Sequence, residues 1–133
     1  MYKFAEELEI EGPKEKFYKL RVNGKCFIDE FWEKIKKEGN YEEDLDKIQV
    51  IIEKMAKGEP IPQKLFKELK GRKKSDPTKD YEISVKKIRI YLFKREKFGK
   101  ILVLGALKDP KGQKADINHL RQIKIEYIKS IQK

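Results

Sequence analysis

Apolar and polar residues alternate in the second half of the chain, and this pattern predicts a β-strand. In the stretch IRIYLF at residues 88–93, isoleucine and leucine occupy every second position, and the other positions carry Arg89, Tyr91 and Phe93. A period of two turns one set toward a core and the other toward the opposite face of the sheet. Strands are predicted in the same way at residues 17–22, 81–85 and 100–107.

A period close to that of an α-helix predicts helices elsewhere in the chain. Leu45, Ile48, Ile52 and Met55 form one apolar stripe, as expected of an amphipathic helix with one buried face. Helices are predicted at residues 27–37, 42–57 and 116–132, with a short helical turn at 63–69. The first two are joined by a two-residue connection, so we expect them to form an antiparallel pair.

The order of these elements is strand, two helices, three strands and a helix, which is typical of an α+β fold. We expect an antiparallel sheet of about four strands, packed against an N-terminal helical hairpin, with a C-terminal helix and the helices on one face. The strand at 100–107 is apolar on both faces and is therefore expected in the centre. Residues 1–15 are interpreted as an acidic N-terminal extension or added edge strand, and residues 16–133 as a single domain.

Positive charge is concentrated in the C-terminal half of the chain. Residues 1–58 contain 12 Lys and Arg against 14 Asp and Glu, whereas residues 59–133 contain 21 against 9, for a net charge of +10. Such asymmetry favours a polyanionic partner, which is nucleic acid, an acidic protein segment or an anionic membrane. The membrane alternative is disfavoured, because the chain has no long apolar run and no basic amphipathic helix with a broad aromatic face.

Two further features bear on the location of the protein. The N-terminal sequence MYKFAEELEIEG is acidic, whereas a secretory signal peptide begins with a basic and then an apolar region. The single cysteine, Cys26, rules out an internal disulfide framework. Both features are expected of a cytoplasmic protein.

The second face of the strand at 88–93 carries a guanidinium group and aromatic rings, and the loop after the next strand adds Lys108, Lys111 and Lys114. Cations next to flat rings are suited to hold phosphates and to stack on bases. The pattern therefore favours RNA as the polyanionic partner. No grouping of His, Cys, Asp and Glu at metal-ligand spacing indicates a metal site.

Three ordered segments carry a resemblance to a known family: KLFKELKG at residues 64–71, DYEISVKKIRIYLF at 80–93 and GKILVLGALKDPKGQKADINHLRQIKIEYIKSI at 99–131. Together they resemble the RelE/HigB-type toxins of bacterial type II toxin–antitoxin systems, in the RelE/ParE superfamily. The resemblance implies a toxin that cleaves mRNA on the translating ribosome without a metal or other cofactor, and that a cognate antitoxin holds inactive. The ribose 2′-hydroxyl would attack the adjacent phosphate, which requires a proton acceptor, cations for the transition state and a proton donor.

The resemblance also implies roles for individual residues. Arg89 matches the strand arginine of the family and is expected to stabilise the phosphate and the transition state; the alternative is an arginine paired with Glu82 on the neighbouring strand. Lys87, Lys108 and Tyr91 complete the expected catalytic set. The expected RNA contacts are Lys86, Lys111, Lys114, Arg121 and Tyr127.

Several of these residues have a second interpretation. Lys86 and Lys87 could be solvated turn residues, and Tyr91 could pack within the sheet. Tyr127 belongs to an apolar helical stripe, which favours a core role for its ring. His119 is the only histidine in the chain, so a two-histidine mechanism is excluded and a surface role is favoured.

Two positions depart from the pattern of the family. Ser84 stands where many relatives carry an arginine, and Asp109 follows Lys108 where relatives often have a second lysine. Both changes remove cations from the expected site, which leaves two alternatives open: a ParE-like toxin that inhibits DNA gyrase without cleaving RNA, and a non-catalytic RNA- or protein-binding relative. A further hypothesis is that residues 1–15 fold over the basic face in the manner of an antitoxin.

Overall fold

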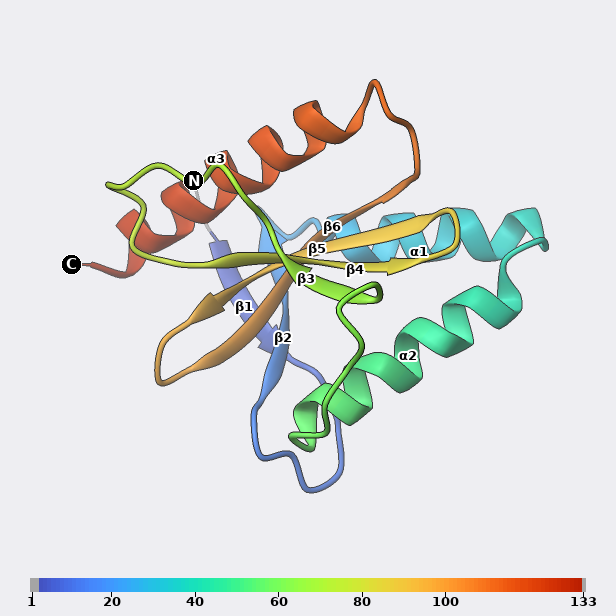
Figure 1. Ribbon diagram of the computed structural model, residues 1–133. Coiled ribbons are helices and arrows are strands. Elements are labelled where there is room, and N and C mark those ends of the chain that lie inside the picture. The colour runs from blue at the N-terminus through green and yellow to red at the C-terminus, as the bar shows by residue number, and fades with distance from the viewer. Residues whose placement is uncertain (1–2, 133) are drawn as a thin grey trace.

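The computed structural model describes residues 3–132 and has an α+β architecture (Figure 1). Its strands are β1 (Lys3–Glu7), β2 (Phe17–Val22), β3 (Phe66–Glu68), β4 (Asp80–Val85), β5 (Ile88–Arg95) and β6 (Gly99–Leu107). Its helices are α1 (Phe27–Glu38), α2 (Glu42–Ala56) and α3 (Gln113–Ile131). The predicted strands and the three predicted long helices therefore lie within a few residues of their expected positions.

The strands form one mixed sheet in the order β1-β2-β6-β5-β4-β3. Neighbouring strands are antiparallel except for β2 and β6, which are parallel. The prediction of an antiparallel sheet of about four strands is thus wrong in strand number and in the direction of one pair. The direction follows from the path of the chain, because α1 and α2 carry it to the far edge and β3 to β6 return it, strand by strand, beside β2.

An added strand at one edge is formed by the acidic N-terminal segment. β1 pairs with β2, from Lys3 opposite Val22 to Glu7 opposite Tyr18. Residues 3–7 of this segment are therefore part of the sheet, where an added edge strand was one interpretation of residues 1–15. Pairing covers an edge of β2 that would otherwise expose unpaired backbone groups.

A helical turn was predicted at residues 63–69, but only residues 63–65 form a turn; the prediction is wrong for residues 66–68, which form β3. Phe66 lies opposite Ile83, and the Ser84 N–H donates to the Leu65 carbonyl at 2.8 Å. A segment this short cannot form a stable helix by itself. The free edge of β4 instead satisfies its backbone hydrogen-bonding groups.

Helices cover both faces of the sheet, which corrects the expectation that they lie on one face. α1 and α2 pack on one face, and α3 crosses the other (Figure 1). The residues of β5 alternate between the two cores: Ile88, Ile90 and Leu92 face α1 and α2, whereas Tyr91 and Phe93 lie beneath α3. The second face is a core because its large aromatic rings gain free energy when they are buried.

α1 and α2 diverge from their connection instead of packing along their whole length (Figure 1). α1 lies against β6 and β2, and α2 lies against β4. Gly39 follows α1 with a φ of 74°, a left-handed conformation that favours glycine. The expected antiparallel pair is opened into a V, since each helix buries its apolar stripe on a different part of the sheet.

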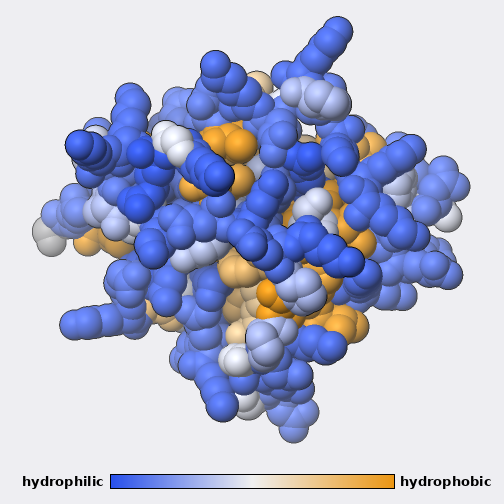
Figure 2. Space-filling view, viewed as in Figure 1, coloured by the Kyte–Doolittle hydropathy of each residue, from blue (hydrophilic) through white to orange (hydrophobic). Residues whose placement is uncertain are grey.

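Hydrophilic side chains cover most of the face shown in Figure 2, and apolar atoms are visible mainly in the gaps between them. This surface fits a sequence in which 42% of the residues are charged. Among residues 3–132, no helix has both the length and the apolar character needed to cross a membrane.

Candidate functional site

Five exposed lysines come together at one end of the sheet. Lys86 and Lys87 form the turn between β4 and β5, and Lys108 follows β6, where its N–H donates to the Lys87 carbonyl at 2.5 Å. Lys111 and Lys114 lie in the loop and the first turn that lead into α3. All five side chains are exposed, and we refer to them as the lysine rim.

The turn within the lysine rim has an unusual backbone. It contains two residues, and the first of them, Lys86, has a φ of 51°. Tight hairpins need a positive φ at this position, which glycine or asparagine usually provides. The ammonium group of Lys86 lies 3.7 Å from the carboxylate of Asp44 in α2. The tight turn therefore forms although the sequence lacks the residues that favour it.

Arg89 lies on β5 beside the lysine rim and is paired with Glu82 of β4. Its Nη1 donates to Glu82 Oε1 at 3.3 Å, and the side chain of Gln113 donates to the same oxygen at 3.1 Å. Lys67 of β3 lies 3.7 Å from the second carboxylate oxygen. The side chains of Glu82 and Arg89 are 1% and 12% exposed. Together with Tyr91, these residues form a nearly closed polar site that we call the Arg89 cluster.

Tyr91 is fully buried, and it brings an unpaired donor into the Arg89 cluster. Among residues 3–132, neither its hydroxyl nor Arg89 Nε has a hydrogen-bond partner. Burial, and then the negative charge of Glu82, raise the pKa of Tyr91 to about 12. The phenol therefore keeps its proton at neutral pH. A buried unpaired polar group costs about 1–3 kcal/mol, so the cluster holds polar groups that packing alone does not explain.

α3 buries two of the expected site residues and holds a third, Arg121, in an ion pair. Tyr91 and Tyr127 are 0% and 2% exposed, and the Tyr127 hydroxyl accepts a hydrogen bond from Arg95 at 2.8 Å. Arg121 donates to Asp80 from Nε at 2.8 Å and from Nη2 at 3.1 Å. These three side chains are engaged within the protein, and the core position considered for Tyr127 is the one found.

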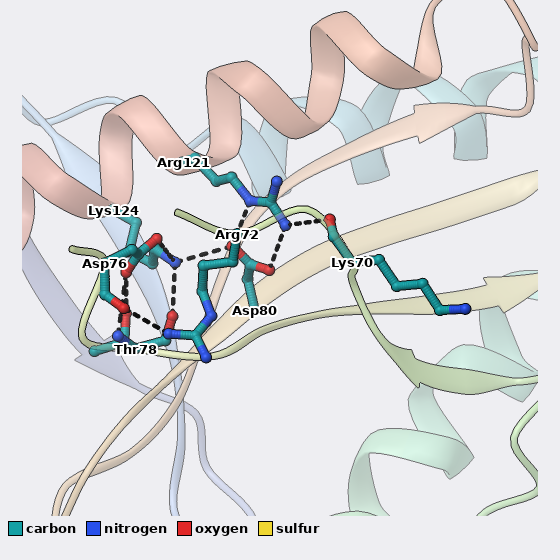
Figure 3. Close-up of polar contacts among 7 residues, drawn as sticks. All are labelled: Lys70, Arg72, Asp76, Thr78, Asp80, Arg121 and Lys124. Carbon is teal, nitrogen blue, oxygen red and sulfur yellow. Dashed lines mark hydrogen bonds and ion pairs between the residues drawn. The ribbon is translucent and has the colours of Figure 1, made fainter. Parts of the chain in front are cut away.

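A buried charge network holds α3 on this face of the sheet (Figure 3). Lys124 is fully buried, and its Nζ lies 2.6 Å from Asp76 Oδ2 and 2.9 Å from Asp80 Oδ2. It also donates to the Thr78 carbonyl at 2.8 Å. Arg121, one turn earlier on α3, binds the same Asp80 carboxylate. We refer to Asp76, Asp80, Arg121 and Lys124 as the α3 clamp.

Electrostatics keep the Asp80 carboxylate of the α3 clamp ionised despite its burial. Burial alone would raise the pKa of Asp80, but the hydrogen bonds and charges of Arg121 and Lys124 outweigh it and hold that pKa below its ordinary value. The hydrogen bond with Asp80 in turn raises the pKa of Arg121. Two carboxylates face two cations, so the clamp is neutral as a whole. The clamp therefore has a structural role, which is to fix α3 in place above the Arg89 cluster.

Sequence reasoning missed two parts of this region. Gln113 lies at the helix start, and nothing in its local pattern marks it as a partner of Glu82. Lys124 interrupts the predicted apolar helix three residues after Arg121, a spacing that places both on one helical face. That spacing was an available signal, but one acidic partner, Asp80, begins β4 and the other, Asp76, lies in the loop before it, where no periodicity marks it.

The described part of the acidic segment does not cover the lysine rim. β1 occupies the edge of the sheet beside β2. Glu15 pairs with Lys94 at 3.7 Å and with Lys100, at the end of β5 and β6 opposite the rim. Residues 3–15 therefore do not fold over the basic face, contrary to the hypothesis that this segment acts in the manner of an antitoxin.

Two remaining candidates for chemistry have ordinary surroundings. Cys26 is buried, and burial raises the pKa of its thiol, which disfavours a reactive thiolate. In the part of the chain that the structure describes, no group of three or more His, Cys, Asp and Glu side chains is placed to hold a metal ion.

The site thus combines an exposed set of cations with a nearly closed set of polar groups. The lysine rim can hold phosphates, and the Arg89 cluster contains a guanidinium, a carboxylate and a protonated phenol. Comparison of the chain with protein family models, with curated proteins and with solved structures found no match.

Proposed function

We propose that this protein is a RelE/HigB-type toxin that binds mRNA on the ribosome and cleaves it without a metal, under the control of a cognate antitoxin in the cytoplasm. The observation that carries the proposal is the lysine rim, in which five exposed cations lie at the end of the sheet where Arg89 is found. A lysine that neutralises a phosphate releases condensed counterions, so such a surface binds RNA with strong salt dependence.

In this proposal the RNA backbone crosses the lysine rim with the scissile phosphate beside Arg89. The planar guanidinium binds phosphate oxygens in a bidentate manner and stabilises the charge that develops in the transition state. Glu82 accepts the proton of the attacking 2′-hydroxyl, and Lys87 or Lys108 donates a proton to the departing 5′ oxygen. The phosphate has to displace Gln113, which now donates to Glu82.

A second candidate function is a non-catalytic RNA-binding relative. It is favoured by the pairing of Arg89 with Glu82 at 3.3 Å and by the burial of Tyr91 beneath α3. In that case the lysine rim still binds RNA, whereas the Arg89 cluster only joins β4, β5 and α3.

Expression without an antitoxin, followed by mapping of RNA 5′ ends, tests the proposal. The natural chain should stop growth and generate new 5′-hydroxyl ends within codons. Arg89→Ala should abolish both, because loss of one transition-state donor lowers the rate by about 10²–10³-fold. Arg21→Ala is a matched control, since Arg21 is also a strand arginine paired with a glutamate of its neighbour, Glu6.

The alternatives give different outcomes in the same experiment. The non-catalytic function would be assigned if the protein binds RNA but generates no new RNA ends, and if charge reversal at Lys108 and Lys111 weakens that binding. DNA breaks in place of RNA ends would assign a gyrase inhibitor. Growth arrest that is the same in Arg89→Ala and the natural chain would contradict the proposed role of Arg89.

A further inference from the structure

A pocket of about 290 Å³ lies at the free edge of β6, between α1 and α3. β2 pairs with β6 only over Lys100–Leu102, so α1 lies beside the rest of the strand. We call this the edge pocket. Its lining comes from Phe27, Phe31, Leu104, Gly105, Asp116 and His119, together with the charged residues Glu30 and Lys34 of α1.

The walls of the edge pocket are aromatic. The rings of Phe27 and His119 are 5.7 Å apart between centroids and tilted by 60°. Phe31 lies directly against the backbone of β6, because a Cβ atom on Gly105 would come within 2.4 Å of its ring. Only glycine permits this contact. The pocket therefore presents flat apolar surfaces of the kind on which nucleobases stack.

Among the described residues, the carboxylate of Asp116 in the edge pocket has no partner. Asp116 is half-buried, and among residues 3–132 its carboxylate takes part in no hydrogen bond or ion pair. Burial raises its pKa, as does Asp109, whereas the charges of His119 and Arg89 oppose the rise. A partly desolvated carboxylate without a donor is able to accept hydrogen bonds from a ligand.

The edge pocket adjoins the lysine rim. Gly105 lies near the end of β6, three residues before Lys108, and Asp116 follows Lys114 by two residues. Ala106, next to Gly105, lies opposite Arg89 in the sheet. An RNA strand whose phosphates lie on the rim therefore passes the opening between α1 and α3.

We propose that the edge pocket binds an unpaired guanine base of the RNA, stacked against Phe27, with Asp116 as the group that reads it. The proposal rests on the proposed function for its RNA, and it adds the base that the site selects. Guanine is the base that offers two adjacent N–H donors, N1–H and the N2 amino group, to one carboxylate. Adenine, cytosine and uracil each lack such a pair, so Asp116 discriminates against them.

His119 provides a direct test, because it is the only histidine in the chain and it lines the edge pocket. Its ring resonances are followed by NMR while guanosine, adenosine, cytidine or uridine is added. Guanosine should shift them saturably, with an affinity about tenfold higher than that of the other nucleosides, as for one bidentate base contact. Asp116→Asn should remove that preference, whereas Asp46→Asn, an equal change on the exposed face of α2, should keep it.

Three results would overturn the proposal: no response to any nucleoside, equal responses to all four, or an unchanged guanosine preference in Asp116→Asn. The nucleosides carry no phosphate, so their binding does not require the lysine rim. If the edge pocket does not bind guanosine, the proposed RNA binding and cleavage are therefore still tested by the growth and end-mapping experiment. Conversely, a chain that neither cleaves nor binds RNA could still show the guanosine response.

Discussion

At Lys86, a residue of the lysine rim, the backbone conformation favours glycine, whereas the positive charge comes from a lysine side chain. Its φ of 51° is left-handed, a conformation that costs a residue with a Cβ atom about 1–2 kcal/mol. Glycine would adopt it without this cost. A lysine here keeps a cation at the tip of the hairpin at the expense of stability, as is observed where strained residues serve a site.

We expect Lys86→Gly to raise the free energy of unfolding by about 0.5–1 kcal/mol, because relief of strain exceeds the added freedom of the unfolded chain. Lys87→Gly removes an equal charge from the same turn, but Lys87 has no positive φ, so it should lower the free energy of unfolding. Urea denaturation measures both changes. A Lys86→Gly protein that is less stable than Lys87→Gly would contradict the strain argument.

Among the elements, α3 decides which part of the sheet is open. Its apolar face covers Tyr91 and Phe93, while the α3 clamp fastens its polar side to β4 and the preceding loop. Buried ion pairs give little net stability compared with apolar packing, but loss of one partner leaves a charge without compensation. The clamp therefore fixes the position of α3 more than it adds to stability.

Lys124→Met tests this role of the clamp. The substitution leaves the Asp76 and Asp80 carboxylates buried with only Arg121 as a cationic partner, so the free energy of unfolding should fall by about 3 kcal/mol. Lys129→Met, on an exposed position of the same helix, should change it by less than about 0.5 kcal/mol. Equal effects of the two substitutions, measured by denaturation, would show that the buried network does not hold α3.

The elements differ in how far the sequence could predict them. The three helices and β2, β4, β5 and β6 have strong local periods, which is why periodicity located them. β1 and β3 depend on strand edges that only the folded sheet provides. The face that α3 occupies was also not predictable, since the contacts that decide it join Arg121 and Lys124 to Asp80 over 41 and 44 residues of sequence.

The same distinction applies to the candidate site. The lysines of the rim were predictable because they lie in turns, where exposure follows from local sequence. The pairing of Arg89 with Glu82 could be considered because strand alternation places both on one face. The burial of Tyr127 was predictable because its ring belongs to the apolar stripe of the helix, whereas the full burial of Tyr91 depends on the placement of α3.

Across the whole molecule, charges are separated into regions with different tasks. The lysine rim lies at one end of β5 and β6, and Glu15 pairs with Lys94 and Lys100 at the other end. Cations at the second end are thus partly neutralised. Within residues 3–132, only Lys86 of the rim is paired with a carboxylate, that of Asp44, in a chain with a net charge of +10. At low pH the surface carboxylates are protonated, so the net positive charge of the protein and its self-repulsion increase. The free energy of unfolding then depends more strongly on the carboxylates that are paired inside the protein.

The pH dependence of folding should reveal the contribution of Asp80. Its pKa is held below the ordinary value of 3.8, so the unfolded state takes up a proton before the folded state does. The resulting stability is present above that ordinary value and is lost as the pH falls through the lowered pKa. Asp80→Asn lacks this contribution and should be less stable at neutral pH. Below about pH 4 the difference between the two proteins should narrow by up to about 1.4 kcal/mol per pH unit.

Denaturation curves recorded from pH 7 to pH 2 measure this difference. Asp116, whose pKa is raised through burial, acts in the opposite direction, but it is present in both proteins and cancels in the comparison. Asp46→Asn changes an exposed carboxylate and should follow the natural chain at every pH. A difference between Asp80→Asn and the natural chain that stays constant in acid would mean that Asp80 has no lowered pKa, and that shape rather than charge accounts for its place in the α3 clamp.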